Sequence, residues 1–425
     1  MKPLVEDLAG RLRELAAQGL ARSLRAGSGI DFSSNDYLGL ARDPALRAAL
    51  LARLAALGPD EPLGAPASRL LRGHTPLHEE LERRLAAWKG AEAALLFPSG
   101  YQANVGVLSA LVGRHDRALS DAGNHASLID GLRLAGCRRV VFPHLDVAAV
   151  ERELAVPHRE GRTFLVTESL FSMDGDAAPL DRYAALAERH GAELIVDEAH
   201  ASGLFGEARG SGLCELHGLE RRVAATVSTL GKALGLAGAC VAGPRVLVEY
   251  LVNRCRSFVF TTAPPPLLLH ALAASLDRVE AEPGRRRRVL GLAGRLRGRL
   301  AAVGIGGLGG VGGLGGGGVA APLCGPIVPV VLGDNFRALA VAERLQRQGF
   351  DVRAIRPPTV PPGTARLRIS VHADHSEAEI DALANALAAA LGEVDGRPAR
   401  VECDSVGTEA PARSAEASEP GAAAR

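Results

Sequence analysis

Short runs of apolar residues, each ended by a polar residue or a turn, recur along the middle of the chain from about Ala93. Stretches with apolar residues at helical spacing, such as LDRYAALAERH, lie between several of these runs. Uninterrupted apolar runs of this length are typical of parallel strands covered on both faces. The pattern predicts an α/β domain with a mostly parallel sheet between helices. The predicted strands are AALLF, RRVVF, TFLVT, ELIVD, AATVS and GACVAG.

Helical periodicity marks the N-terminal part of the chain. Residues 4–25 are predicted to form an amphipathic helix, and Asp43 with Pro44 opens a second helix that runs to about Leu57. The first helix carries its leucines on one face: Leu4, Leu8, Leu12 and Leu15.

A long helix over residues 286–303 is predicted to lead into a smaller α+β domain at the C-terminal end. Its expected elements are PIVPVVLG, FRALAVAERLQRQG, ARLRISV and SEAEIDALANALAAAL. The domains expected are an N-terminal helix and arm (1–44), a large cofactor-binding domain (45–285), the C-terminal small domain (286–396) and a disordered tail (397–425).

A glycine-rich segment, residues 304–318, contains G-x-G-x-x-G at Gly304, Gly306 and Gly309. A dinucleotide site needs a strand before this motif and a helix after it. Here a predicted helix precedes it and no helix follows, so we interpret the segment as a flexible loop.

Composition narrows the functional class. The net charge of +1 gives no reason to expect nucleic acid or an anionic membrane as a partner. The six cysteines are scattered, which suits neither a zinc site nor a disulfide framework, and the N-terminus lacks the apolar core of a signal peptide. We therefore expect a cytoplasmic protein with reduced thiols and without bound metal.

Only three of the 49 basic residues are lysines: Lys2, Lys89 and Lys232. Lys232 lies in the glycine-flanked turn STLGKALG after a predicted strand. A solvated turn lysine is one interpretation. The other is that this position needs an amine, because an amine can lose its proton and form a Schiff base whereas a guanidinium cannot. Lys89, at the end of LHEELERRLAAWKG, is expected to be solvated.

Polar residues follow several of the predicted strands. ELIVDEAH delivers Asp197 and His200, FPSGYQAN forms a strand-to-helix turn, GNHASLID carries His125, and TESLFSMDGD carries Glu168, Ser169 and Ser172. Ligands of open α/β sheets bind at the carboxyl ends of strands, and a helix N-terminus there can bind phosphate. DEAH also occurs in helicases, but the chain has no G-x-x-x-x-G-K-[ST] loop, which excludes that function.

Together these stretches resemble the α-oxoamine synthases, pyridoxal phosphate (PLP) enzymes of fold type I. The similarity runs from residue 32 to about residue 390. It rests on FSSNDYLGL, FSMDGDAAPLD, VDEAH, GKALG and IRPPTVPPGTARLR. The fold implied is a large domain with a mostly parallel sheet and a smaller α+β C-terminal domain.

The resemblance also implies a role for individual residues. Lys232 would carry PLP as a Schiff base, Asp197 would pair with the pyridine nitrogen, and His125 would stack on the ring and touch substrate. The phenolic oxygen of the cofactor would contact His200 and Ser172. Phosphate would be bound by Gly100, Tyr101 and Thr229 and, from the partner subunit of a homodimer, by Thr261 and Thr262. Substrate would be bound by Arg22, Asn35, Thr359 and Arg368, with Arg368 holding the amino-acid carboxylate.

The implied reaction is the decarboxylative condensation of L-alanine with a pimeloyl thioester, carried on CoA or on acyl carrier protein. IRPPTVPPGTARLR favours this member of the family over its siblings. Three alternatives remain: a sibling that uses another amino acid or acyl chain, an aminotransferase, and a non-catalytic relative that only binds partners.

Overall fold

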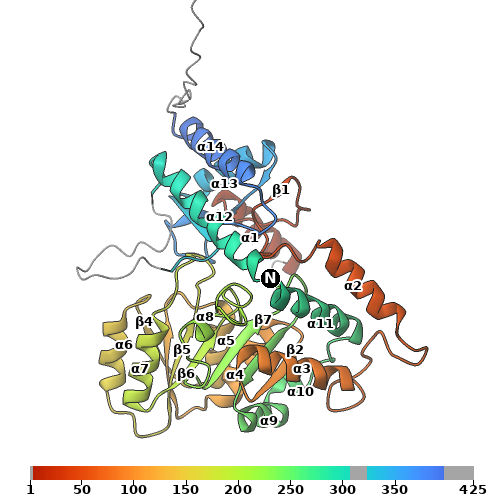
Figure 1. Cartoon of the computed structure of the whole chain (residues 1–425). Coiled ribbons are helices and arrows are strands. Elements are labelled where there is room, and N and C mark those ends of the chain that lie inside the picture. The colour runs from red at the N-terminus through yellow and green to blue at the C-terminus, as the bar shows by residue number, and fades with distance from the viewer. Residues whose placement is uncertain (1–2, 307–322, 397–425) are drawn as a thin grey trace, which may run out of the picture.

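The computed structural model describes residues 3–306 and 323–396. Its centre is a seven-stranded sheet with the strand order β2-β8-β7-β6-β5-β3-β4 (Figure 1). The bounds are β2 (Ala93–Phe97), β3 (Arg117–Asp121), β4 (Arg138–Phe142), β5 (Thr163–Glu168), β6 (Glu193–Asp197), β7 (Ala225–Thr229) and β8 (Ala239–Gly243).

All six predicted strands are present, and RALSD adds β3. The central pairs are parallel, whereas β8 runs antiparallel to both of its neighbours. The GACVAG strand therefore departs from the parallel pattern. Because only β8 is reversed, the other strands all end at the same edge of the sheet.

Alternate residues of each strand face opposite cores, as the pleat of a strand requires. Leu95 and Phe97 pack in one hydrophobic cluster, whereas Ala94 and Leu96 pack in the other. One cluster lies under α4 (Gly100–Leu111), α5 (Ala126–Ala135), α9 (Arg245–Arg254) and α10 (Arg256–Val259). The other lies under α3 (Pro76–Lys89), α6 (Val147–Ala155), α7 (Leu180–His190), α8 (Leu213–Leu216) and α11 (Pro266–Ala281).

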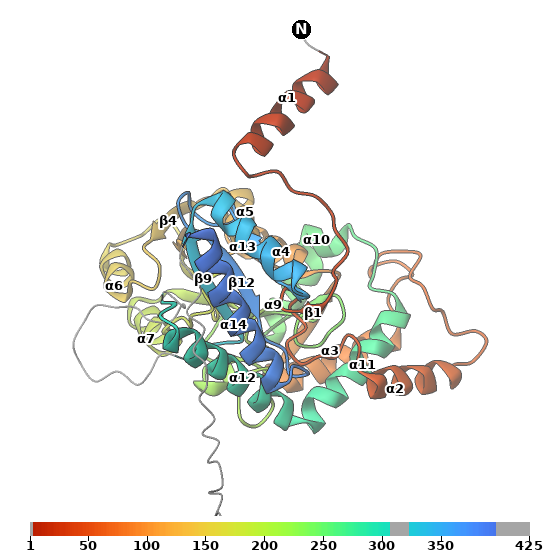
Figure 2. The ribbon, with the colours of Figure 1, turned by 90° about the horizontal axis from the view of Figure 1, so that it is seen from above.

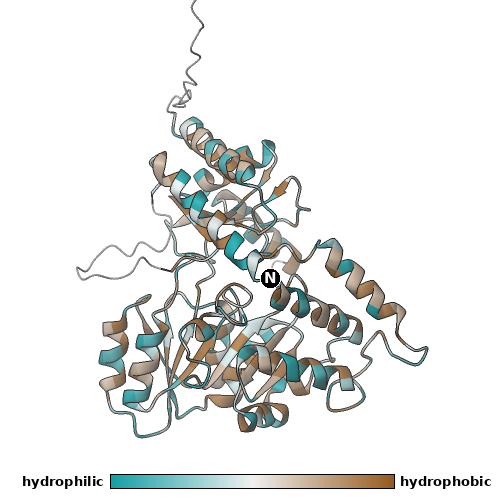
Figure 3. Cartoon of the chain, viewed as in Figure 1, coloured by the Kyte–Doolittle hydropathy of each residue, from teal (hydrophilic) through white to brown (hydrophobic). Residues whose placement is uncertain are grey.

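The covering helices are amphipathic. Figure 3 shows hydrophilic and hydrophobic residues side by side along α6 and α7. In α7, Leu180, Tyr183, Ala184, Leu186 and Ala187 are buried, while the other residues between Leu180 and Ala187 are exposed. This pattern matches the helical periodicity of LDRYAALAERH.

A smaller antiparallel sheet, in the order β11-β12-β9, lies in the C-terminal part of the chain (Figure 1). Its strands are β9 (Ile327–Gly333), β11 (Arg353–Ile355) and β12 (Ala365–Ser370). The helices of this part are α12 (Pro283–Ala302), α13 (Asn335–Arg347) and α14 (Glu377–Val394). The predicted arrangement of a large α/β part and a smaller α+β part is confirmed.

The N-terminal segment reaches this smaller part, because β1 (Ile30–Asp31) pairs with β10 (Phe350–Asp351). Asp43 caps α2 (Pro44–Ala55) as predicted, since its side chain accepts a hydrogen bond from Leu46 N. The first helix is shorter than the predicted 4–25, because α1 (Leu4–Ala17) ends at Ala17. Figure 2 shows that α1 projects from the rest of the chain. Its four leucines are exposed.

Two further expectations concern segments near the site. The apolar residues of FVFTT predict a strand that ends at Thr261 and Thr262, but α10 and a turn occupy this stretch, so both threonines follow a helix. Most of the glycine-rich segment 304–318 and the tail 397–425 lie outside the described residues. No helix of the described residues is long and apolar enough to cross a membrane.

Candidate active site

Lys232 follows β7, and its side chain points toward the turn after β6. Its Nζ lies 2.9 Å from Nε2 of His200, whose Nδ1 lies 2.7 Å from the hydroxyl of Tyr37. Burial lowers the pKa of Lys232 to about 8, although the charges of Asp197 and Glu168 oppose this shift. The pKa of His200 is also lowered, by burial and then by the charges of Lys232 and Arg368. The structure thus provides a lysine amine close to the pKa that proton transfer at neutral pH requires.

Asp197 ends β6 and is held by two donors. Its Oδ2 accepts a hydrogen bond from Asn104 Nδ2 at 2.6 Å, and its Oδ1 accepts one from Ala199 N at 2.8 Å. Asn104 Nδ2 also donates to Ser127 Oγ, which in turn lies 2.7 Å from Nδ1 of His125. One chain of contacts from β6 through α4 to α5 therefore fixes both Asp197 and His125.

The start of α4 lies against the end of β7. A Cβ atom added to Gly100 would lie 2.4 Å from Cγ2 of Thr229, so only glycine fits at this approach. Ser99 caps the helix by accepting a hydrogen bond from Gln102 N, and the hydroxyl of Tyr101 donates to Asp130. Backbone N–H groups at a helix start attract phosphate, and the predicted phosphate residues Gly100, Tyr101 and Thr229 gather here.

Arg368 is buried, and all of its described partners are neutral. Its Nε donates to Ser172 O at 2.6 Å and its Nη1 to Ser370 Oγ at 3.0 Å. Its Nη2 donates to Asn35 Oδ1 at 2.9 Å and to the Tyr37 hydroxyl at 3.2 Å. A buried guanidinium oriented only by neutral groups is well suited to bind an anion.

The remaining predicted residues lie around this centre. Arg22 Nη2 donates to Thr359 Oγ1 at 3.1 Å, so these two residues form a pair. Ser172 is buried beside Arg368, whereas Thr261 is half-buried and Thr262 is exposed. In the described part of the chain, neither threonine joins the hydrogen bonds that connect Lys232 to Arg368.

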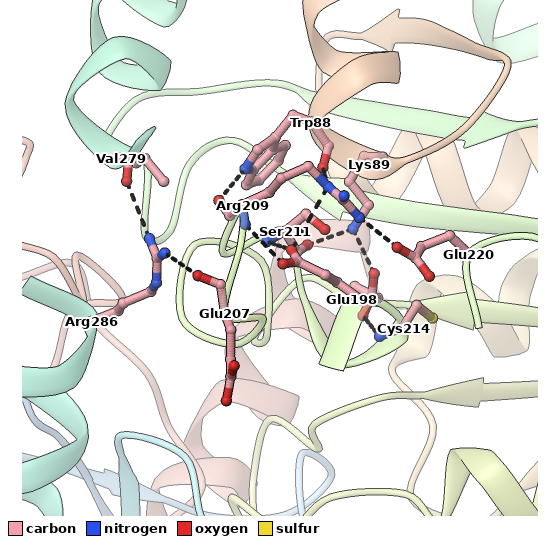
Figure 4. A network of polar contacts seen from close by, with 11 residues as sticks. Trp88, Lys89, Glu198, Glu207, Arg209, Ser211, Cys214, Glu220, Val279 and Arg286 are labelled. Atoms are coloured by element: carbon pink, nitrogen blue, oxygen red, sulfur yellow. Dashed lines mark hydrogen bonds and ion pairs between the residues drawn. The ribbon is translucent and has the colours of Figure 1, made fainter. Parts of the chain in front are cut away.

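The expectation of a solvated Lys89 is wrong. Its side chain is 1% exposed, and its Nζ lies 2.5 Å from Glu198 Oε2 and 2.6 Å from Ser211 O (Figure 4). Glu198 also accepts a hydrogen bond from Cys214 N. Lys89 is the last residue of α3, and α3 packs on β2 and β8. The Lys89 side chain therefore faces inward, toward the sheet. The residue therefore supports the turn that carries Asp197 and His200.

The aminotransferase class I and II family matches residues 28–387 of the chain. The chain belongs to this family. Two relatives named 8-amino-7-oxononanoate synthase come from Anaeromyxobacter sp. (strain K) and Geobacter sulfurreducens. They are 46% and 42% identical over 400 residues, each covering 91% of this chain, and 96% and 98% of the respective relative.

Solved structures in this family agree with the fold. A serine palmitoyltransferase from S. paucimobilis, solved with bound PLP and myriocin, is 30% identical with a TM-score of 0.81, covering 93% of this chain and 100% of that one. An 8-amino-7-oxononanoate synthase from Francisella tularensis is 26% identical with a TM-score of 0.69, covering 87% and 98%. Fold type I and the resemblance to the α-oxoamine synthases are confirmed.

Three residues of the site had no assigned role in the sequence analysis: Tyr37, Asn104 and Glu168. Tyr37 joins His200 to Arg368, and Asn104 holds Asp197. Tyr37 lies in FSSNDYLGL and Asn104 in FPSGYQAN, so both fall within quoted motifs. Nothing in their local sequence distinguishes them from structural residues, because their partners lie far away along the chain. Glu168 ends β5 directly opposite Asp197 in the strand register.

Proposed function

We propose that the chain is an 8-amino-7-oxononanoate synthase that joins L-alanine to a pimeloyl thioester, with PLP held on Lys232. The observation that carries the proposal is the half-buried Lys232, whose amine contacts His200 and shares the site with Asp197 and Arg368. The family and the relatives at 46% identity support the same activity. An aminotransferase or a non-catalytic relative accounts less well for this combination of the site and the named relatives.

The described residues fit PLP at each of its functional groups. Lys232 would provide the amine, Asp197 would pair with the ring nitrogen, and the close approach of Gly100 to Thr229 would hold the phosphate. His125 would stack on the ring, and His200 and Ser172 would contact its phenolic oxygen. When bound, PLP supplies a carbonyl for an amine to attack and a ring that withdraws electrons from the substrate α-carbon.

The residues of this chain bind the substrate and transfer its proton. Arg368 binds the alanine carboxylate, with Asn35 and Tyr37 fixing the plane of its guanidinium. Lys232 removes the proton from the α-carbon of alanine, since its lowered pKa leaves a share of the amine neutral near pH 7. The α-carbon then bonds to the thioester carbonyl carbon as the C–S bond breaks, and the alanine carboxylate leaves as CO2. Lys232 returns the proton to the α-carbon.

The acyl chain is expected to run toward Arg22 and Thr359. Arg22 is exposed on the segment between α1 and β1, and it reaches Thr359 in the IRPPTVP segment. Arg356 donates to Gly19 O and Ala21 O, which holds this segment in place. We propose that the guanidinium of Arg22 binds the far carboxylate of the pimeloyl chain.

The test is a direct assay. Purified protein with PLP is mixed with L-alanine, L-serine or glycine and with pimeloyl, octanoyl or palmitoyl thioesters of CoA or acyl carrier protein, and product mass is measured. We expect 8-amino-7-oxononanoate from L-alanine and a pimeloyl thioester. Product only from serine and a palmitoyl thioester would instead identify the second candidate, a sibling activity suggested by the serine palmitoyltransferase structures.

We further propose that the enzyme is a cytoplasmic homodimer. Exposed apolar side chains surround the segment of Thr261 and Thr262, a composition typical of protein interfaces. They are Leu63, Leu70, Leu71 and Phe260. The loop of Leu63 is tied to this segment by hydrogen bonds from Ala263 N to Ala67 O and from Leu267 N to Leu63 O. Four cysteines (Cys137, Cys214, Cys240 and Cys255) are free thiols, as a reducing compartment implies.

A further inference from the structure

A second carboxyl group lies beside Asp197, and the mechanism above does not use it. Glu168 ends β5 and is the register partner of Asp197 at the end of β6. Its side chain is buried, and it faces the backbone N–H groups of His125 and Ser172. It therefore stands between two segments that the proposed function assigns to the cofactor.

The two carboxyl groups differ in how their oxygens are hydrogen-bonded: each oxygen of Asp197 has a donor, whereas one oxygen of Glu168 has none. Asp197 is held by Asn104 and by Ala199 N, both of which stabilise a carboxylate. Glu168 Oε1 is buried without a hydrogen-bond partner, and so is Asn104 Oδ1. Glu168 Oε1 and Asn104 Oδ1 can only accept hydrogen bonds while Glu168 is ionised. When Glu168 is protonated, one of its oxygens becomes a donor.

Two neighbouring carboxylates in a buried site repel each other, and one of them then keeps its proton. Besides Asp197, the titratable groups that interact with Glu168 are Lys232 and Tyr37. The side chains of His125, His200 and Arg368 lie around Lys232. Lys232 is the cation that acts directly on Glu168, and it also serves Asp197. Because Lys232 is shared between the two buried carboxyl groups, it offsets the charge of only one of them at a time. Protonation of Glu168, whose Oε1 has no hydrogen-bond partner, removes the repulsion between the two acids.

We propose that Glu168 is a positioning residue that stands as a neutral carboxylic acid at neutral pH, so that Asp197 carries the single negative charge that would pair with the ring nitrogen of the cofactor. The effect of Glu168 on the cofactor rests on the proposed function. The protonation of Glu168 does not depend on that function. In support, burial raises the pKa of Glu168 to about 8, with the charge of Asp197 adding to this rise and that of Lys232 opposing it.

The first test uses the cofactor-free protein and infrared spectroscopy of the carboxyl groups. Wild type should show the carbonyl stretch of a buried protonated acid near neutral pH, and the band should disappear as pH rises through about 8. Glu168→Gln should lack the band. Glu193→Gln, which removes an exposed carboxyl from the start of β6, should keep it. A wild-type protein without the band, or a Glu168→Gln protein that retains it, overturns the proposal.

The second test measures coupling to Asp197. Asp197→Asn removes the neighbouring charge, so the loss of the Glu168 band should move to lower pH. A role of Glu168 in packing alone would not move this midpoint. Because both tests need neither alanine nor a thioester, a failed synthase assay leaves them valid, and their failure leaves the synthase assay valid.

The pH dependence of stability gives a third measurement. An acid whose pKa rises from 4.5 when unfolded to about 8 when folded costs stability that grows with pH between those values. Glu168→Gln removes this cost. Its Tm relative to wild type should therefore increase from about pH 5 to about pH 8 and stay level above that. A constant difference across this range contradicts the proposal, because a normally ionised Glu168 gives no such trend.

Discussion

Arg366 and Arg368 lie two residues apart on β12, and both are buried. Their partners differ in charge. Arg366 forms an ion pair with Asp174 and donates to Thr364 O, so its charge is compensated within the chain. Arg368 has only neutral described partners, and its charge is available to a ligand. The sequence favours Arg368 only through the family resemblance, whereas the contacts distinguish the two residues physically.

Replacing Arg368 with lysine should weaken alanine binding and leave PLP bound. An ammonium group cannot reproduce the planar, two-pronged contact of a guanidinium with a carboxylate. We expect the KM for alanine to rise at least about tenfold, or about 1.4 kcal/mol. Arg366→Lys is the matched control and should change KM much less. Equal, small effects in steady-state assays at both positions would mean that another residue, with Arg356 as the next candidate, binds the carboxylate.

At the scale of elements, the turn after β6 depends on α3 as well as on the sheet. Lys89 at the end of α3 forms a buried ion pair with Glu198, the residue between Asp197 and the rest of the turn. Trp88 Nε1 donates to Arg209 O, and Arg209 Nε donates back to Trp88 O (Figure 4). The end of α3 and the 198–211 segment are therefore joined by reciprocal polar contacts.

Lys89→Met should destabilise the protein strongly, because it leaves Glu198 charged and buried without its cation. Breaking such a pair costs about 3–5 kcal/mol. The double variant Lys89→Met/Glu198→Gln should recover much of this loss, since no unpaired charge then remains. Arg83→Met, which breaks an exposed pair with Glu80 on the same helix, should cost less than about 1 kcal/mol. Urea unfolding of the four proteins measures these differences, and similar losses for Arg83→Met and Lys89→Met would refute the buried-pair argument.

At the scale of the whole molecule, the active site joins parts of the chain that lie far apart in sequence. Tyr37 from the N-terminal segment connects His200 of the large sheet to Arg368 of the small one. The domain boundaries at 45–285 and 286–396 stay a prediction. The contacts nevertheless show that the proposed cofactor and carboxylate residues meet between the two sheets, where a change in their packing would alter the site.

The proposed dimer adds a second chain to each site, and complementation tests this. If Thr262 binds the partner's cofactor phosphate, a Lys232→Ala protein mixed with an impaired Thr262→Ala protein should regain activity. In the hybrid dimer one of the two sites has both its lysine and its threonine. Subunit exchange is checked with tagged chains. A fully active monomer by sedimentation, or no recovery despite proven exchange, would reject the shared site.

The sequence by itself determined the class of fold and the chemistry at its centre. The apolar runs of strands and the caps of helices depend on neighbouring residues, so β2, β6 and the start of α2 could be predicted locally. The scarcity of lysine indicated a special role for Lys232, and the family motifs predicted the roles of Asp197 and His200. These motifs stay readable because each is a short run of adjacent residues.

Only the tertiary structure decided which side chains meet and which are buried. The sequence around Lys89 is typical of a solvated helix end, yet the packing of α3 directs the Lys89 side chain inward against Glu198. Glu168 became a neighbour of Asp197 through the parallel register of β5 and β6, across 29 residues of chain. The periodicity of α1 predicts an apolar face, but it does not predict whether another element covers that face. In the structure this face is exposed. Burial and charge compensation depend on distant partners, so no local pattern in the sequence encodes them.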